Sequence, residues 1–256
     1  MDVGKNEITP VRCQSCTNAG KLDFHFDYAY QPIVDVRSGK AFAHEALVRG
    51  ANGEGASTVL DRITEENQYR FDQACRVKAV EGAARLGIKE NISINFLPNA
   101  VYRPEVCIRT TLAAARANNF PVERIIFEVT EGERINDGPW FAEILREYKK
   151  IGFQTAIDDF GAGYAGLKLL SDFQPDFVKI DMDLIRNVHQ SRARKSIVRG
   201  ICEICVELDI LVIAEGIEDK RERDFLRDVG IYLMQGFLFA KPAFRGVAAI
   251  DPNSLL

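Results

Sequence analysis

The chain has 256 residues, of which 46% are hydrophobic and 27% are charged, and its formal net charge of −4 accompanies a pI near 5.6. This composition is typical of a globular protein with a sizeable core, and the acidic balance excludes a broad surface for nucleic-acid polymers. No apolar run is long enough to span a membrane, and the N-terminus lacks the apolar core of a signal peptide. We therefore expect a cytoplasmic protein that has no membrane segment.

Eight apolar runs of strand length organise the middle of the chain. Residues 1–22 are polar and aperiodic and are predicted to form a flexible N-terminal tail, residues 23–250 one domain, and residues 251–256 a short C-terminal tail. The runs cover residues 28–36, 40–49, 91–96, 124–130, 153–160, 176–181, 209–216 and 232–240. Only Arg37, Ser38 and Gly39 separate the first two runs, which permits an antiparallel hairpin and forbids a parallel crossover.

Amphipathic stretches lie between the later runs. Residues 69–87 are predicted to form a helix that stops at Gly87, and residues 139–152 a helix that starts at Pro139. Residues 182–208 are long enough for a helix with a break. Strands that alternate with helices imply a parallel sheet, so we predict an α/β fold, a modified TIM-type (β/α)₈ barrel with an antiparallel first strand. A doubly wound open sheet is the alternative.

Two C-x-x-C pairs raise the question of a zinc site. Cys13 and Cys16 lie in the predicted tail, whereas Cys202 and Cys205 lie within a long helical pattern. Together they could bind zinc, but structural zinc pairs usually sit on turns. We favour core packing for the second pair and a mobile or redox-active tail for the first.

Polar residues interrupt the apolar runs at their C-terminal ends. They are Glu45, Arg49, Asn95, Glu128, Glu131, Asp158, Asp159, Lys179, Asp181, Glu215 and Gln235. An isolated charge in apolar surroundings is costly unless it is paired or bound to a metal. Because seven strands share this feature at the same end, the pattern predicts a barrel active site; structural ion pairs around the rim are the alternative.

The residue types at these positions indicate the chemistry. Carboxylates, one amide and one ammonium dominate, and the three histidines are scattered, so the site favours Mg²⁺ or Mn²⁺ over zinc. Adjacent carboxylates such as Asp158 and Asp159 suit two metals about 3.5–4 Å apart, because one carboxylate can bridge while the other binds the second ion. Such a pair activates a water and stabilises charge on a phosphoryl oxygen, with Lys179 placed to orient that water. The expected substrate is a phosphate ester.

The glycines after Asp159 match a second, incompatible motif. Gly161, Gly163 and Gly166 spell G-x-G-x-x-G, the pyrophosphate loop of dinucleotide-binding domains. That loop expects an apolar strand running straight into the first glycine, whereas here Asp158 and Asp159 would face the pyrophosphate. Only a short helix can follow. We therefore interpret the glycines as a flexible loop beside the metal site.

Taken together, these motifs resemble the EAL family of cyclic di-GMP phosphodiesterases over about residues 23–250. The matching segments are "EALVR", "NF", "EVTE", "DDFGAGYAGL", "VKID", "AEGIE" and "QGFLFAKP". The resemblance implies a TIM-like barrel with an antiparallel first strand. It also implies hydrolysis of cyclic di-GMP to linear pGpG, dependent on Mg²⁺ or Mn²⁺ and inhibited by Ca²⁺.

The resemblance also implies roles for individual residues. Glu45, Asn95, Glu128 and Asp158 would hold one metal, and Asp158, Asp159 and Glu215 the second, with Asp158 bridging. Lys179 would contact the catalytic water, a role it would share with Glu215 in one-metal versions of the mechanism; Glu45 completes the catalytic set. Glu131 would anchor the loop after Asp159. Arg49, Gln235 and Gln31 would contact the substrate, with Asp181 beside them.

Three functions follow from this reading. The leading one is a homodimeric phosphodiesterase that hydrolyses cyclic di-GMP by two-metal activation of water, the dimer forming through the loop and helix beyond Asp181. The second is a catalytically silent cyclic di-GMP receptor that acts through an unknown protein partner. The third is an interaction module that docks a partner on the barrel exterior.

Overall fold

A closed barrel of eight strands forms the centre of the protein. The computed structural model describes residues 22–101, 103–130, 138–163 and 166–256. The strands are β1 (Phe26–Asp35), β2 (Lys40–Gly50), β3 (Asn91–Asn95), β4 (Ile125–Thr130), β5 (Gln154–Phe160), β6 (Phe177–Ile180), β7 (Leu211–Ala214), β8 (Leu233–Met234) and β9 (Ala243–Phe244). Neighbours follow the order β2 to β8, then β1, and β1 pairs back with β2 to close the sheet. The predicted barrel is confirmed, and the open doubly wound sheet is excluded.

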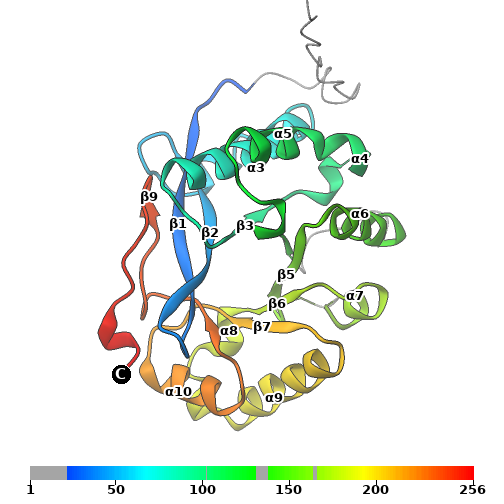
Figure 1. Cartoon of the computed structure of the whole chain (residues 1–256). Coiled ribbons are helices and arrows are strands. Elements are labelled where there is room, and N and C mark those ends of the chain that lie inside the picture. The colour runs from blue at the N-terminus through cyan, green and yellow to red at the C-terminus, as the bar shows by residue number, and fades with distance from the viewer. Residues whose placement is uncertain (1–21, 102, 131–137, 164–165) are drawn as a thin grey trace, which may run out of the picture.

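Helices surround the strands on the outside of the barrel (Figure 1). They are α2 (Ser57–Leu60), α3 (Gln68–Arg85), α4 (Pro104–Cys107), α5 (Arg109–Ala117), α6 (Gly138–Ile151), α7 (Gly166–Asp172), α8 (Met182–Ile185), α9 (Arg192–Glu207) and α10 (Lys220–Asp228). Short 3₁₀ turns are η1 (Pro98–Ala100), η2 (Val122–Arg124), η3 (Val188–Gln190) and η4 (Pro252–Ser254). The predicted break within residues 182–208 separates α8 from α9, where Asn187 adopts a left-handed φ of +55°. No helix in these described ranges is long and apolar enough to cross a membrane.

The hairpin of β1 and β2 gives the barrel its antiparallel strand. The Gly39 N–H donates to the Asp35 carbonyl at 2.8 Å, and Gly39 has a φ of +69°, which favours glycine at this turn. β1 is antiparallel to β2 and β8, whereas the pairs from β2–β3 to β7–β8 are parallel. Figure 1 shows β1 and β2 as the longest strands, running alongside each other. The other seven barrel strands therefore end at the same rim.

A layer of apolar side chains fills the barrel interior below that rim. It comprises Ile33, Ala43, Ile126, Ala156, Phe177, Ile213 and Leu233, one from each barrel strand except β3. Side chains two positions apart on a strand point to the same face. Polar residues two positions beyond this layer must therefore also face the barrel interior, nearer to its mouth.

Helix α3 contains a buried ion pair that the sequence analysis missed. The Asp72 carboxylate pairs with the Arg76 guanidinium, and both side chains are at most 1% exposed. Arg76 also donates to the Tyr148 hydroxyl at 3.2 Å, and Asp72 accepts the Leu97 N–H at 3.0 Å. The pair thus joins α3 to α6 and to the segment that follows β3.

Of the two C-x-x-C pairs, the structure describes only Cys202 and Cys205. Cys202 and Cys205 lie on α9, as predicted, with Cys205 fully buried in the core and Cys202 half-buried. Burial raises the pKa of the Cys202 thiol to about 11 and that of Cys205 to about 12, so both stay protonated at neutral pH. Cys13 and Cys16 lie outside the described residues.

The last six residues contact the barrel. Ser254, in η4, is 1% exposed, and its carbonyl accepts a hydrogen bond from the buried Arg223 guanidinium. Leu255 packs against the apolar cluster that lies beneath α9 and α10. Residues 251–256, separated as a tail in the sequence analysis, therefore include side chains of the packed structure.

Candidate active site

The strand register brings polar residues from all eight barrel strands to one place. Gln31, Glu45, Glu128, Asp158, Lys179, Glu215 and Gln235 each lie two positions from a member of the apolar interior layer. Asn95 on β3 lies two positions after the buried Ser93 and pairs in register with Glu128. Alternation along the strands thus turns all of these side chains into the mouth of the barrel.

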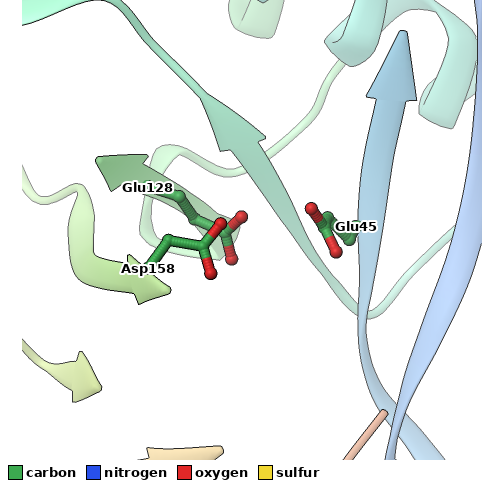
Figure 2. A group of neighbouring side chains, drawn as sticks. All are labelled: Glu45, Glu128 and Asp158. Atoms are coloured by element: carbon green, nitrogen blue, oxygen red, sulfur yellow. The ribbon is translucent and has the colours of Figure 1, made fainter. Parts of the chain in front are cut away.

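Two groups of three carboxylates meet there and share Asp158. One group is Glu45, Glu128 and Asp158, and the other is Asp158, Asp159 and Glu215; within each, the oxygen atoms lie within 4.8 Å of one another. Figure 2 shows the first group, with side chains from β2, β4 and β5 directed into a common space. Carboxylate oxygens that converge in this way are ligands suited to Mg²⁺ or Mn²⁺.

An irregularity in β5 lets two adjacent residues contribute to the same site. Consecutive strand residues normally point to opposite faces, but the pairing of β5 with β6 shifts register between Ile157 and Phe160. Within this shift Asp159 adopts a φ of +53°, which is strained for a residue other than glycine. The Asp159 backbone N–H donates to Asp158 Oδ1 at 2.9 Å, which fixes the Asp158 carboxylate against the backbone of Asp159. A left-handed residue in a bulge therefore adds the fifth carboxylate.

The ammonium group of Lys179 lies among these carboxylates. Its Nζ is 2.6 Å from Glu215, 3.0 Å from Asp158, 3.1 Å from Glu128 and 3.6 Å from Glu45. Burial by itself would lower the pKa of Lys179, but the neighbouring carboxylates raise it by more. The pKa of Lys179 is therefore well above its usual range. Lys179 is therefore a cation and a hydrogen-bond donor at neutral pH.

A chain of amide hydrogen bonds fixes the orientation of Glu45. Gln31 Nε2 donates to the Ala240 carbonyl at 3.0 Å, which leaves Gln31 Oε1 to accept from Gln235 Nε2 at 3.2 Å. Gln235 Nε2 also donates to Glu45 Oε2 at 2.7 Å. On the other side, Asn95 Nδ2 donates to Glu45 Oε1 and to Glu128 Oε2, both at 3.3 Å. Gln31 and Gln235 are buried and hold Glu45 in place, and both line a cavity of about 240 Å³ beside it; their contact with substrate stays a prediction.

Burial makes three of these carboxyl groups, those of Glu128, Asp159 and Glu215, weaker acids than usual. Burial, with Glu45 and Asp158 nearby and Lys179 opposing them, raises the pKa of Glu128 to about 8. Burial and the neighbouring Asp158 and Asp181 raise the pKa of Asp159 to about 6. Burial also raises the pKa of Glu215 well above its usual range. In the absence of bound cations, burial thus shifts these three groups toward their protonated forms.

The remaining residues from the sequence analysis lie at different distances from this cluster. Asp181, 8% exposed, lines the same cavity of about 240 Å³ as Asp159 and Glu215, and its carboxylate accepts the Asp183 N–H at the start of α8. Arg49 donates to the Val48 carbonyl at 2.7 Å and lines a neighbouring cavity of about 320 Å³. Glu131 lies outside the described residues.

Five residues that the sequence analysis did not single out also line the 240 Å³ cavity. Met182 and Phe237 are the two large apolar ones, beside Gly216, Glu218 and Gly236. Each of the two apolar residues follows a predicted site residue closely, Met182 after Asp181 and Phe237 two positions after Gln235. That spacing is the signal that could have drawn attention to them.

The donor set fits divalent cations on two further grounds. Glu128 Oε1 is buried and has no hydrogen-bond partner within the described residues, so one carboxylate oxygen is left for a ligand. If all five carboxylates ionise, they and the Lys179 ammonium leave a formal charge of −4, which two divalent cations would neutralise. In that ionised state, pairing with Lys179 alone would leave most of the negative charge unneutralised.

Comparison with known proteins agrees with this geometry. The EAL domain family matches residues 18–242, which is most of the chain. The chain belongs to the EAL domain family. Two curated relatives from Escherichia coli (strain K12) are similar to it: the blue light- and temperature-regulated antirepressor BluF, 37% identical over 92% of this chain, and the cyclic di-GMP phosphodiesterase PdeR, 38% identical over 83%.

Solved structures of EAL proteins resemble the whole barrel. A standalone versatile EAL protein from Vibrio cholerae O395, in its c-di-GMP bound form, is 51% identical with a TM-score of 0.89, over 91% of this chain and 99% of that one. Klebsiella pneumoniae BlrP1, in a manganese/cy-diGMP complex, is 35% identical with a TM-score of 0.83, over 91% of this chain and 60% of that one. The chain spans 58% of BluF and 33% of PdeR, so it matches one part of those longer proteins.

Proposed function

We propose that this EAL protein is a phosphodiesterase that hydrolyses cyclic di-GMP to linear pGpG with the help of Mg²⁺ or Mn²⁺. The observation that carries the proposal is the pair of carboxylate groups that share Asp158 at the mouth of the barrel. Relatives support the substrate: PdeR is named a cyclic di-GMP phosphodiesterase, and the Vibrio cholerae protein binds c-di-GMP. BlrP1 has been solved with manganese and with calcium in complexes with the nucleotide, which supports divalent cations at this site; inhibition by Ca²⁺ is part of the proposal that the family resemblance implies.

The described residues divide into two ligand sets. Glu45, Asn95, Glu128 and Asp158 would hold one cation, and Asp158, Asp159 and Glu215 the other, with Asp158 shared. Asn95 would bind the cation through its Oδ1, while its Nδ2 would keep its hydrogen bonds to Glu45 and Glu128. Bound cations would supply a polarised water and neutralise charge on the phosphodiester oxygens.

The protein's own groups would prepare the site for this chemistry. Lys179 holds a proton on Nζ and donates to the carboxylates, and the same ammonium is close enough to Glu215 and Asp158 to orient a water between them. Its raised pKa makes Lys179 a donor and not the general base. Glu215, which also contacts Lys179, is the better proton acceptor of the two. Gln235 and Asn95 fix the direction of Glu45, so the ligand set needs little reorganisation.

The direct test follows the nucleotide itself. Purified protein is incubated with cyclic di-GMP and Mn²⁺, Mg²⁺, Ca²⁺ or EDTA, and products are separated by chromatography. We expect pGpG with Mn²⁺ or Mg²⁺ and none with Ca²⁺ or EDTA. Unchanged cyclic di-GMP with every cation would contradict the proposal.

A receptor that signals through a protein partner is the second candidate. It is favoured by the similarity to BluF, which is named an antirepressor and so acts through another protein. Against it, all five of the carboxylates expected to bind metal are present and converge. Calorimetry separates the two candidates: tight binding of cyclic di-GMP without turnover in any divalent cation would support the receptor.

We also propose that the protein forms a homodimer beyond Asp181. A groove of about 450 Å³ lies there between α7, α8 and α9, with Leu184, Ile197 and Ile201 among its lining residues. Ile197 is 47% exposed and Leu167, on its edge, is 63% exposed. A second copy could cover this apolar surface, and Gly161 and Gly163 on the same groove would connect the interface to the segment after Asp159.

A further inference from the structure

A buried carboxylate on α10, outside the carboxylate cluster, holds two segments of chain together. Glu222 lies on the first turn of α10 and is 1% exposed. Its Oε2 accepts the backbone N–H groups of Glu218 at 3.1 Å and Asp219 at 3.2 Å. Its Oε1 accepts the N–H of Asn187 at 2.7 Å. A buried carboxylate needs such donors, because an unpaired one would cost free energy, and here the donors come from two separate segments.

A helix cap explains only part of this arrangement. In the capping box of α10, the side chain of the N-cap residue Asp219 accepts backbone N–H groups of the first turn, and Glu222 accepts the Asp219 N–H in return. The hydrogen bond from Asn187 lies outside this motif. Asn187 is 35 residues away in sequence and comes from the break between α8 and α9. Glu222 therefore does more than begin its own helix.

The two segments that Glu222 joins both line the cavity beside the carboxylate cluster. Residues 181–187 follow β6, and residues 215–219 follow β7. Each segment begins with a carboxylate of the 240 Å³ cavity, Asp181 in the first and Glu215 in the second. The position of Glu215 thus depends on what holds residues 215–219 in place.

Other contacts hold this segment less completely. The Ile217 N–H donates to the Gln235 carbonyl at 3.1 Å, which attaches one side of the segment to the residue after β8. On the side of residues 181–187, Arg186 pairs with Glu218 at 2.7 Å, but these side chains are 30% and 48% exposed. An ion pair that is open to solvent contributes little to stability. The buried carboxylate on α10 is therefore the stronger connection on that side.

We propose that Glu222 is a positioning residue for Glu215, which it holds in the geometry that binds the second cation; this inference rests on the proposed function. Glu222 does not line the cavity and acts through the backbone of residues 215–219. Residues behind metal ligands orient them, and their loss typically lowers metal affinity or activity by about 10- to 100-fold. Without the Glu222 carboxylate, three N–H groups lose their acceptor and residues 215–219 can move away from residues 181–187.

The test measures Mn²⁺ binding by calorimetry without nucleotide, and cyclic di-GMP turnover on the same samples. For Glu222→Ala we expect the affinity for the second Mn²⁺ ion to fall by at least about tenfold. The kcat should fall by a similar factor, whereas KM for cyclic di-GMP should change by less than about twofold, because Glu222 does not line the cavity. Glu222→Gln keeps one acceptor oxygen and should lose less of both, and it carries the test if Glu222→Ala does not fold.

Asp219→Ala is the matched control, because it removes the other half of the capping box and leaves Glu222 with Asn187. It should retain the Mn²⁺ affinity and the kcat of the wild type, even where urea unfolding in EDTA shows that it is less stable. Unchanged Mn²⁺ affinity in both Glu222 variants, or an equal loss in Asp219→Ala, would overturn the positioning role and leave the proposed function intact.

Two results with the wild type separate this inference from the proposed function. A wild type that binds Mn²⁺ but leaves cyclic di-GMP intact would refute the proposed function, and the Mn²⁺ affinities of the variants would then decide the role of Glu222. A wild type that binds no Mn²⁺ would overturn both.

Discussion

At the scale of single residues, the site depends on charges held close together in a buried place. Lys179 Nζ contacts four carboxylates. One of them, Glu45, also accepts hydrogen bonds from Gln235 and Asn95. Raised pKa values for Glu128 and Asp159 show that burial and mutual repulsion outweigh the single ammonium. The metal-free site is therefore electrostatically incomplete.

Replacing Lys179 by Met should destabilise the metal-free protein. The change leaves buried carboxylates without their cation, and breaking such a pair typically costs about 3–5 kcal/mol in the free energy of unfolding. Protonation of Glu128 and Glu215 offsets part of the loss, so it should grow as pH rises. Urea unfolding in EDTA measures this loss of stability, and added Mn²⁺ should restore part of the free energy of unfolding. Lys168→Met, at an exposed position, is the control; equal stability of the two variants would contradict the account.

Cation binding should depend on the protonation of Asp159. Its pKa of about 6 lies above the value near 3.9 of an unfolded chain, so the metal-free folded state holds this proton more tightly. The contribution of Asp159 to metal-free stability is thus greatest at low pH and is lost as pH rises through about 6. A cation must displace the proton, so Mn²⁺ affinity should rise as pH passes through about 6, and it should rise further toward pH 8 as Glu128 also loses its proton.

Calorimetry of Mn²⁺ binding between pH 5 and 8, in buffers of different ionisation enthalpy, tests this expectation. Below about pH 6, proton release on Mn²⁺ binding should be smaller in Asp159→Asn than in the wild type, because Glu128 and Glu215 still release protons in the variant. Affinity that does not change with pH in the wild type would argue against Asp159 as a ligand.

At the scale of elements, helix α3 depends on a buried ion pair for its packing against the rest of the barrel. Its buried pair, Asp72 and Arg76, connects the helix to Tyr148 on α6 and to Leu97, two residues after Asn95. Burial of Asp72 raises its pKa despite Arg76, so the arrangement is stable only while every partner is present.

Removing the Arg76 side chain should lower the free energy of unfolding much more than removing an exposed arginine side chain of the same helix. We expect Arg76→Ala to lower the free energy of unfolding by about 3–5 kcal/mol, because Asp72 is left buried without its cation. Arg85→Ala, exposed at the end of α3, should change it by less than about 0.5 kcal/mol. Chemical unfolding monitored by circular dichroism measures both, and similar values for the two variants would refute the role given to the pair.

At the scale of the whole molecule, strand periodicity made much of the fold predictable. Apolar runs that end in polar residues gave the eight strands, the closed barrel and the mouth where Glu45, Glu128 and Lys179 meet. The positions of Asp159, Asp72 and Arg76 could not be predicted this way. A bulge that turns two adjacent residues to one side breaks strand alternation, and a charge on a helix is assigned to the exposed face unless its buried partner is known.

The proposed dimer can be tested at this scale. Ile197→Glu places a charge in the apolar groove beyond Asp181 and should shift the protein from dimer to monomer in light scattering after size-exclusion chromatography. Val206→Glu changes an exposed residue of the same helix that does not line the groove, and it should leave the dimer unaffected. A wild-type monomer, or two variants with the same mass, would contradict the interface.

The central claim is that Asp158 and Asp159 join two cation sites that together act on a phosphodiester. Its most direct test counts Mn²⁺ ions bound per chain and measures cyclic di-GMP turnover on the same samples of wild type, Asp159→Asn and the exposed control Asp172→Asn. We predict two ions and turnover in the wild type and the control, and one ion with turnover reduced at least about a hundredfold in Asp159→Asn. Full turnover in Asp159→Asn, or a wild type that binds no Mn²⁺, would contradict the account.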